Sequence, residues 1–118
     1  MITIIALFIG ILHVWIFVAE SILWGRPPVN KMFKMDAVLA EHNRVFAFNQ
    51  GFYNLFLALG IFAGIWLGEK GELLVLFCVL SVLGAGVVLF ISSPKYRIAP
   101  LLQSGPALIY LVVRFLAP

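Results

Sequence analysis

Residues 41–60 read EHNRVFAFNQGFYNLFLALG. This stretch runs from charged sequence into a long apolar segment, yet it carries Asn49, Gln50, Tyr53 and Asn54. Unpaired polar groups are costly in the hydrocarbon core of a membrane, so these side chains need hydrogen-bonding partners. The stretch therefore predicts a membrane helix whose polar side lies against protein.

The composition of the whole chain is typical of a membrane protein. Of its 118 residues, 64% are hydrophobic and only 11% are charged, which is far from the average of soluble domains. Four apolar runs each approach the roughly 20 residues that cross a bilayer, and they cover residues 2–24, 44–67, 73–91 and 98–116. The first run lacks the features of a cleaved signal peptide, so we expect it to be retained. We expect one domain over residues 1–118, an all-α, integral membrane, antiparallel four-helix bundle.

The basic residues predict how the chain is oriented in the membrane. They gather in two loops, between the first and second spans (Arg26, Lys31, Lys34 and Arg44) and between the third and fourth (Lys95 and Arg97). The positive-inside rule then places both loops in the cytoplasm and both chain ends outside. The net charge of +3 is small and dispersed, which argues against a nucleic-acid partner. A single cysteine, Cys78, excludes an internal disulfide.

The first span contains two ionisable side chains, His13 and Glu20. They are seven residues apart and share one face of a helix with Trp24, which lies four residues further on. Ionisable groups inside a membrane are expensive and are candidates for function, here as an acid and a base in catalysis. The alternative is that a neutral His13 bonds a neighbouring helix while Glu20 stays hydrated near the interface. One histidine and one glutamate fall short of a metal-ligand set, so no metal site is expected.

The loop after the first span contains the signals for a turn and for the start of the second helix. Pro27 and Pro28 prevent the first helix from continuing. Asp36 is of the residue type that caps a helix N-terminus. We therefore expect the second helix to begin before the bilayer, with residues 37–43 as a short cytoplasmic extension of the span.

The second and fourth spans each carry a polar stripe. Asn43, Gln50 and Asn54 recur at i, i+7 and i+11, as do Gln103, Tyr110 and Arg114, whereas the third span has no such stripe. Beside the stripe of the second span lie the small residues Ala47, Gly51 and Ala58, which allow a neighbouring backbone to approach closely. The polar stripes are therefore expected to face protein.

The depth of each polar group in the membrane predicts which groups meet. With a rise of about 1.5 Å per residue, Glu20, Gln50 and Gln103 lie at one level, roughly 6 to 9 Å inside the cytoplasmic boundary. His13 and Asn54 lie deeper. We therefore expect a polar cleft among the first, second and fourth helices that opens toward the cytoplasm, with Arg44, Asn49 and Arg97 at its mouth.

The run from Asn49 to Gly60, with Gln103 to Leu108 in the fourth span, resembles an uncharacterised bacterial family of small four-span proteins. That family is catalogued as domain of unknown function 1304, and the likeness covers nearly the whole chain. It implies a fold and a bacterial inner-membrane location, but no activity.

A second resemblance is to the membrane-associated proteins in eicosanoid and glutathione metabolism, which are also four-helix bundles and typically trimers. Arg44, Asn49 and Tyr53 are similar to the arginine, asparagine and tyrosine of that family's second helix, and the run from Arg97 to Pro100 to the start of its fourth. The spacing from Arg44 to Asn49 is one residue too long, and Phe52 stands where an acidic side chain is expected. The likeness implies glutathione as a cofactor, with Arg44 or Arg97 lowering the pKa of its thiol.

Three functions follow as hypotheses. The first is binding of a small amphipathic or lipid-like molecule in the cleft, through Asn49, Gln50, Tyr53, Asn54, Gln103, Arg44 and Arg97. The second is a membrane enzyme that acts on a lipophilic substrate. It would use Glu20 and His13 as acid and base, similar to the emopamil-binding sterol isomerases, or glutathione activated by Arg44 or Arg97, similar to glutathione transferases. The third is a structural protein whose polar residues join helices, including those of a homo-oligomer. Membrane lipid is the expected partner in each case.

Overall fold

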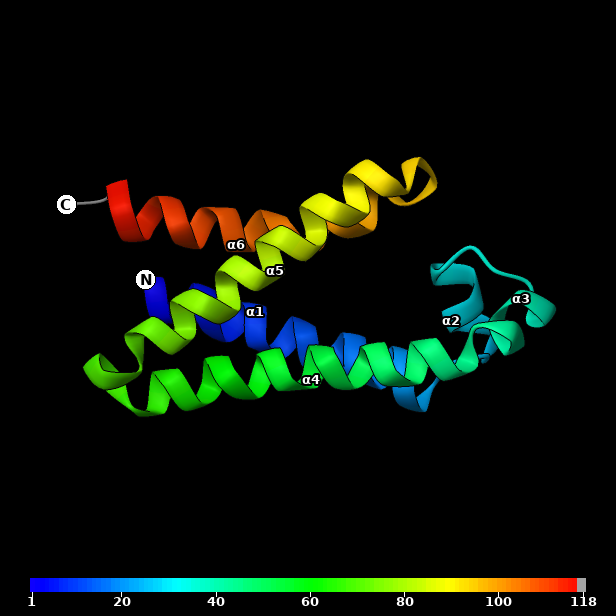
Figure 1. Cartoon of the computed structure of the whole chain (residues 1–118), viewed down its shortest axis with the longest axis horizontal. Coiled ribbons are helices and arrows are strands. Elements are labelled where there is room, and N and C mark those ends of the chain that lie inside the picture. Colours follow the sequence, from blue (N-terminus) through cyan, green and yellow to red (C-terminus); the bar gives the residue numbers. More distant parts are fainter. Residues whose placement is uncertain (117–118) are drawn as a thin grey trace. The chain divides into compact units, whose positions relative to one another are not determined.

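The computed structural model describes residues 1–116, and every regular element in them is helical (Figure 1). The long helices are α1 (Ile2–Phe17), extended by the π-helical turn η1 (Val18–Ile22), α4 (Arg44–Trp66), α5 (Glu72–Ser92) and α6 (Ile98–Leu116). Shorter elements connect them: α2 (Pro27–Met32), α3 (Ala37–His42) and the 3-10 turns η2 (Gly68–Gly71) and η3 (Pro94–Tyr96). The prediction of an all-α protein is confirmed.

The four predicted spans correspond to four helical segments that are long and apolar enough to cross a membrane. Their ends are close to the predicted ones, for example 44–66 in place of 44–67 and 72–92 in place of 73–91. Large apolar side chains remain exposed along them, such as Phe77 at 67% and Ile91 at 73%. A soluble protein rarely leaves such surfaces in water, so the chain is an integral membrane protein of four spans.

By its internal contacts the chain forms two compact units, and α1 and α4 contribute residues to both. One unit consists of residues 1–12 and 57 onward, and the other of residues 13–56. We call them the hairpin unit, after the α5–α6 hairpin, and the loop unit, after the first loop. Each unit has its own apolar core.

The hairpin unit is built around the antiparallel pair α5 and α6, which run side by side (Figure 1). Its core joins apolar side chains from all four long helices, among them Ile9, Ile61, Val79 and Ala107. Gly86 of α5 lies directly against Ser104 of α6, and a Cβ added there would clash with the Ser104 hydroxyl. Small residues thus permit the close helix contact that is usual in membranes.

The loop unit contains the long first loop, which is folded into two short helices. Arg26 is extended, with φ −72° and ψ 145°, and Pro27 occupies the first turn of α2, where proline is tolerated. The Trp24 indole Nε1 donates to the Ala40 carbonyl at 2.7 Å and ties α3 to the end of the first span. The Trp24 ring also meets Phe33 edge-on, with centroids 5.1 Å apart.

The start of α3 agrees with the sequence, but its end does not. Asp36 caps it, accepting a hydrogen bond of 2.8 Å from the Leu39 backbone N–H. The segment from Ala37 to Asn43 was expected to extend the second span, whereas it forms the separate helix α3. The helix ends because Asn43 leaves helical geometry, with φ −97° and ψ 3°, and its side-chain amide donates to the Leu39 carbonyl at 3.0 Å.

Candidate functional site: a pocket beside Glu20

Glu20 lies on the π-helical turn η1, near the end of the first span. The turn is closed by a hydrogen bond of 2.9 Å from the Leu23 N–H to the Val18 carbonyl, five residues back. Such wide turns are rare in proteins, and those that occur often lie at functional sites. The turn leaves Glu20 only 6% exposed.

The backbone of α4 approaches this turn closely at Gly51. A Cβ added to Gly51 would lie 3.1 Å from the Glu20 Cβ and would clash with the Ser21 hydroxyl. The Ser21 Oγ donates a hydrogen bond of 2.8 Å to the Phe48 carbonyl, one turn earlier in α4. Gly51, predicted to be a packing position, therefore brings η1 and α4 together at the site.

The Glu20 carboxylate accepts a hydrogen bond from a polar side chain of α4. The Asn54 side-chain amide donates to Glu20 Oε2 at 3.1 Å and also to the Gln50 backbone carbonyl at 3.0 Å. A carboxylate has about four lone-pair positions, so the bond from Asn54 uses only part of its acceptor capacity.

A cavity of about 290 Å³ opens beside this carboxylate. Its walls are formed by η1 and the residues just after it, and by the first turns of α4. The lining residues are Glu20, Ser21, Trp24, Arg44, Val45 and Phe48. The wall is mostly apolar, with an acidic group and a basic group as its charged members. An apolar lining with a few polar groups is the usual composition of a small-molecule pocket.

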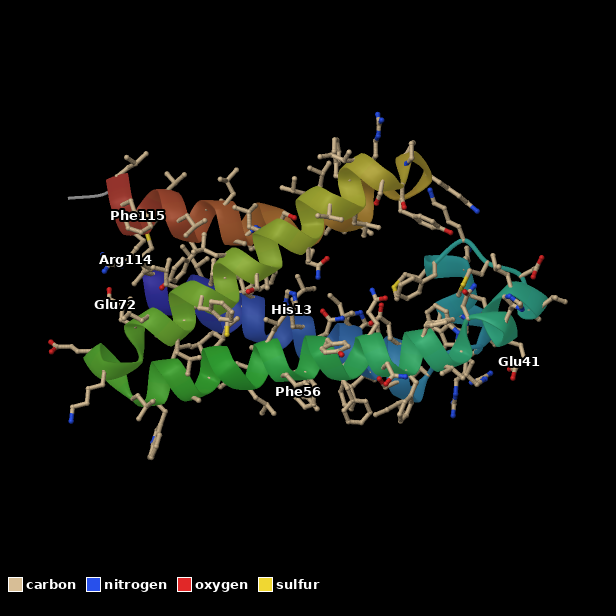
Figure 2. The ribbon with its side chains drawn as sticks, viewed as in Figure 1. His13, Glu41, Phe56, Glu72, Arg114 and Phe115 are labelled. Carbon is tan, nitrogen blue, oxygen red and sulfur yellow. The ribbon has the colours of Figure 1, made fainter. Side chains whose placement is uncertain are left out.

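Arg44 is held at the pocket by several contacts within the loop unit. Its Nε donates to Glu41 Oε2 at 2.7 Å, and its Nη1 donates to the Trp24 carbonyl at 3.2 Å. Gly25 has a positive φ of 87°, and a Cβ added there would stand 2.6 Å from Arg44 Nη2. Glu41, on α3 just before α4 (Figure 2), thus orients the guanidinium together with the loop backbone.

Aromatic rings continue from the pocket wall along α4. Phe48 contacts Phe52 with centroids 5.1 Å apart, and Phe52 contacts Phe17 of α1 at the same centroid distance. Phe56 follows at 6.3 Å from Phe52. These rings form an apolar row that leads away from the charged groups.

The other residues predicted for the site are distributed more widely. Asn49 is exposed, and its amide donates to the Val45 carbonyl of its own helix at 2.8 Å. Gln50 and Tyr53 are also exposed, Tyr53 at 69%. His13, which projects from α1 (Figure 2), is fully buried and is not among the residues that line the pocket.

Gln103 and Arg97 belong to the hairpin unit, where Arg97 lies over the Phe90 ring at 5.3 Å. Among the predicted residues, the structure therefore joins Glu20 and Asn54 by a hydrogen bond and puts Arg44 in the same pocket wall. The depths calculated from the helical rise put Glu20 at the level of Gln50. The side-chain hydrogen bond of Glu20 is instead with Asn54, one turn further along α4.

Sequence reasoning missed the apolar wall and Ser21. Trp24 shares a helical face with Glu20, four residues away, and that spacing was a usable signal. Val45 and Phe48 carry no such signal, because apolar residues are everywhere in this chain. Within residues 1–116, no group of three His, Cys, Asp or Glu side chains is arranged to hold a metal ion.

Comparison with known proteins yields one match. A family model described as "Protein of unknown function (DUF1304)" matches residues 7–115, which include Glu20, Arg44 and Asn54. No curated protein and no solved structure matches the chain.

Proposed function

We propose that this chain, which belongs to the DUF1304 family of proteins of unknown function, binds a small amphipathic or lipid-like molecule in the pocket beside Glu20. The observation that carries the proposal is a buried carboxylate with spare acceptor capacity that faces a cavity of about 290 Å³. By the positive-inside rule this pocket lies at the cytoplasmic end of the membrane protein.

The chemistry of the wall defines the ligand. Glu20 accepts a hydrogen bond from an amine or a hydroxyl group, and Arg44 attracts an anionic or carbonyl oxygen. Trp24 and Phe48 contact the apolar part of the molecule. The volume is close to the lower limit of about 300 Å³ for ligand pockets, so it fits a small molecule or the polar end of a lipid.

Binding is favoured over catalysis by the arrangement of the candidate acid and base. Glu20 lines the pocket, but His13 does not, so a ligand held there meets only one of the two groups. Arg44 in the pocket wall fits the glutathione-dependent alternative, since a guanidinium stabilises a thiolate. That alternative predicts retention of the protein on immobilised glutathione and loss of retention in Arg44→Gln.

The proposal also competes with a purely structural role, in which Asn54 and Glu20 only join two helices. Their hydrogen bond uses part of the carboxylate's capacity and leaves the pocket beside it open. A structural role predicts that removal of pocket-wall side chains affects stability alone. The binding role predicts loss of a bound molecule from a protein that remains folded.

The decisive experiment is mass spectrometry of molecules that co-purify with the detergent-extracted protein. We expect one species to be retained by the natural chain and to fall about tenfold or more in Glu20→Gln, because hydrogen bonds to charged groups contribute about 1.5–3 kcal/mol. Phe48→Ala should also reduce it. Phe46→Ala is the matched control, since Phe46 lies on the same helix, is 75% exposed and does not line the pocket.

Two results would contradict the proposal. One is that no small molecule co-purifies above the level found with an unrelated four-span protein. The other is that Glu20→Gln and Phe48→Ala retain the molecule as fully as Phe46→Ala does. Either result leaves the structural role as the better account of Glu20 and Asn54.

A further inference from the structure

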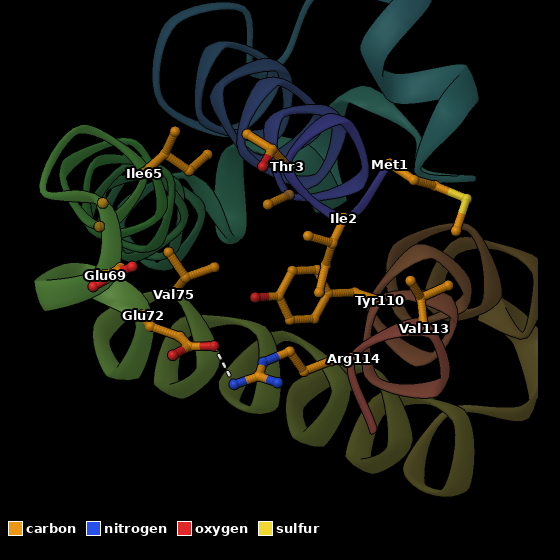
Figure 3. Close-up of a pocket in the computed structure, with 13 residues that line it drawn as sticks. Met1, Ile2, Thr3, Ile65, Glu69, Glu72, Val75, Tyr110, Val113 and Arg114 are labelled. Carbon is orange, nitrogen blue, oxygen red and sulfur yellow. Dashed lines mark ion pairs between the residues drawn. The ribbon is translucent and has the colours of Figure 1, made fainter. Parts of the chain in front are cut away.

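A larger cavity lies in the hairpin unit, formed at the end of that unit where α1 begins, α4 ends, α5 begins and α6 ends (Figure 3). Its volume is about 790 Å³, within the range of sites that hold drug-sized ligands. All of its lining residues belong to this unit. The walls are apolar at Ile2, Ile65 and Val113, and the polar side chains that line them include those of Tyr110, Glu69, Glu72 and Arg114.

Tyr110 supplies a hydroxyl to this cavity. The residue is 4% exposed, and Figure 3 shows its ring reaching from α6 into the cavity with the hydroxyl at the inner end. A hydroxyl can both donate and accept hydrogen bonds, so this one can bind a polar group held in the cavity.

Glu72 and Arg114 form an ion pair in the cavity wall and point toward one another (Figures 2 and 3). Their side chains are 48% and 37% exposed, so both charges are accessible. The pair leaves unused groups on each partner, because a guanidinium has five N–H donors and a carboxylate about four lone-pair positions. A second acidic side chain, Glu69, lines the same cavity.

This combination of charges selects against ligands of a single sign. An anion is attracted by Arg114 but repelled by Glu72 and Glu69. A cation is attracted by the two glutamates but repelled by Arg114. A zwitterion with an anionic and a cationic group meets a partner for each. Because the groups stand at helix ends beside apolar walls, the ligand is also expected to carry an apolar part.

We propose that this cavity is a binding site for a zwitterionic phospholipid with a phosphoethanolamine head group. The phosphate accepts hydrogen bonds from the Arg114 guanidinium and the Tyr110 hydroxyl, and the ammonium donates to Glu72 and Glu69. The start of the acyl chains contacts Ile2 and Val113. The site shares no residue with the pocket beside Glu20, so it stands independently of the function proposed above.

The test is native mass spectrometry of the protein in detergent, titrated with phosphatidylethanolamine, phosphatidylglycerol or free phosphoethanolamine. We expect the natural chain to retain phosphatidylethanolamine several-fold more than phosphatidylglycerol at equal concentration. Tyr110→Phe, which keeps the packed ring, should lower that retention several-fold. Tyr53→Phe is the matched control, because Tyr53 is 69% exposed and does not line the cavity.

Charge variants check the assignment of the head group. Glu72→Gln should remove the preference for ethanolamine over glycerol, whereas Arg114→Gln should weaken both lipids; Arg114→Lys keeps the charge if the Gln variant fails to fold. The proposal is overturned if the natural chain does not discriminate between the two lipids, or if Tyr110→Phe behaves as Tyr53→Phe. Binding of free phosphoethanolamine without the intact lipid would overturn the lipid assignment.

Discussion

At the scale of single residues, the informative quantity is the free-energy cost of placing the Glu20 carboxylate in a membrane span. A carboxylate within a membrane span costs about 2.5 kcal/mol or more on insertion scales, although a position near the helix end lowers that cost. An interhelical hydrogen bond in a folded membrane protein contributes about 0.6 kcal/mol on average. The bond from Asn54 therefore offsets only part of the cost, and helix association alone gives a weak reason for a glutamate at this position.

Asn54→Leu tests how much that hydrogen bond contributes to the stability of the protein. We expect a loss of about 0.6–1.7 kcal/mol in the free energy of unfolding, between the average and the largest value measured for such bonds, because Glu20 then lacks its amide partner. Reversible unfolding in mixed detergent micelles measures it. Asn49→Leu is the control and should change stability little, since the Asn49 amide bonds only to its own helix and is exposed.

The same substitution made in a Glu20→Gln background completes a double-mutant cycle. The loss should shrink, because the neutral glutamine side chain in that background carries no charge that needs the amide. Equal losses in both backgrounds, or an Asn54→Leu protein as stable as Asn49→Leu, would mean that the two side chains are not coupled.

At the scale of elements, the helix contacts depend on glycines placed where another helix crosses. Gly51 allows the π-helical turn η1 to pack closely against α4, and Gly86 allows Ser104 of α6 to pack closely against α5. Gly84, on the same helix as Gly86, has open space around it, with nothing within 4 Å of an added Cβ. Glycine on a membrane helix is therefore structurally required at some positions of α5 and not at others.

Gly86→Ala should destabilise the α5–α6 hairpin by about 1–3 kcal/mol, because the added methyl group overlaps the Ser104 hydroxyl and forces the helices apart. Thermal unfolding in detergent, followed by helical circular dichroism, measures the change. Gly84→Ala is the matched control and should be neutral or slightly stabilising, since alanine favours a helix. Adding Ser104→Gly to Gly86→Ala should restore part of the loss; no difference between the two alanine variants would refute the contact.

At the scale of the whole molecule, the orientation in the membrane is still a prediction from charge. Four spans put the Lys31 and Lys95 loops on one side and the Lys70 turn on the other. Six basic residues in the two loops outweigh Lys70 and Arg114, so the loops are expected in the cytoplasm. The phosphoethanolamine site would then open on the outer side and the pocket beside Glu20 on the inner side.

Cysteine labelling checks this orientation. In a Cys78→Ala background, a membrane-impermeant maleimide should label Lys70→Cys in intact bacterial spheroplasts, and should label Lys31→Cys and Lys95→Cys only after lysis. The reverse pattern would place the basic loops outside. Mixed labelling of all three positions in intact spheroplasts would instead indicate that the chain inserts in both orientations.

Most of the fold could be predicted from the sequence because membrane spans are determined locally. The length and apolarity of a span and the loops that flank it can be read from consecutive residues. The family resemblance predicted from residues 49–60 and 103–108 is confirmed by the match over residues 7–115. The break at Asn43 was not predicted, because a helix that continues from Ala37 has a similar local pattern.

The sequence by itself determined the class of protein, the number of spans and the unusual presence of Glu20 and Asn54 in apolar helices. Only the tertiary structure decided their partnership, because the two residues lie 34 positions apart in the chain and meet only where η1 packs against α4. The cavity around Tyr110 was equally invisible in the sequence. Its lining comes from residues as far apart as Ile2 and Arg114, and such distant residues meet only when the helix ends converge.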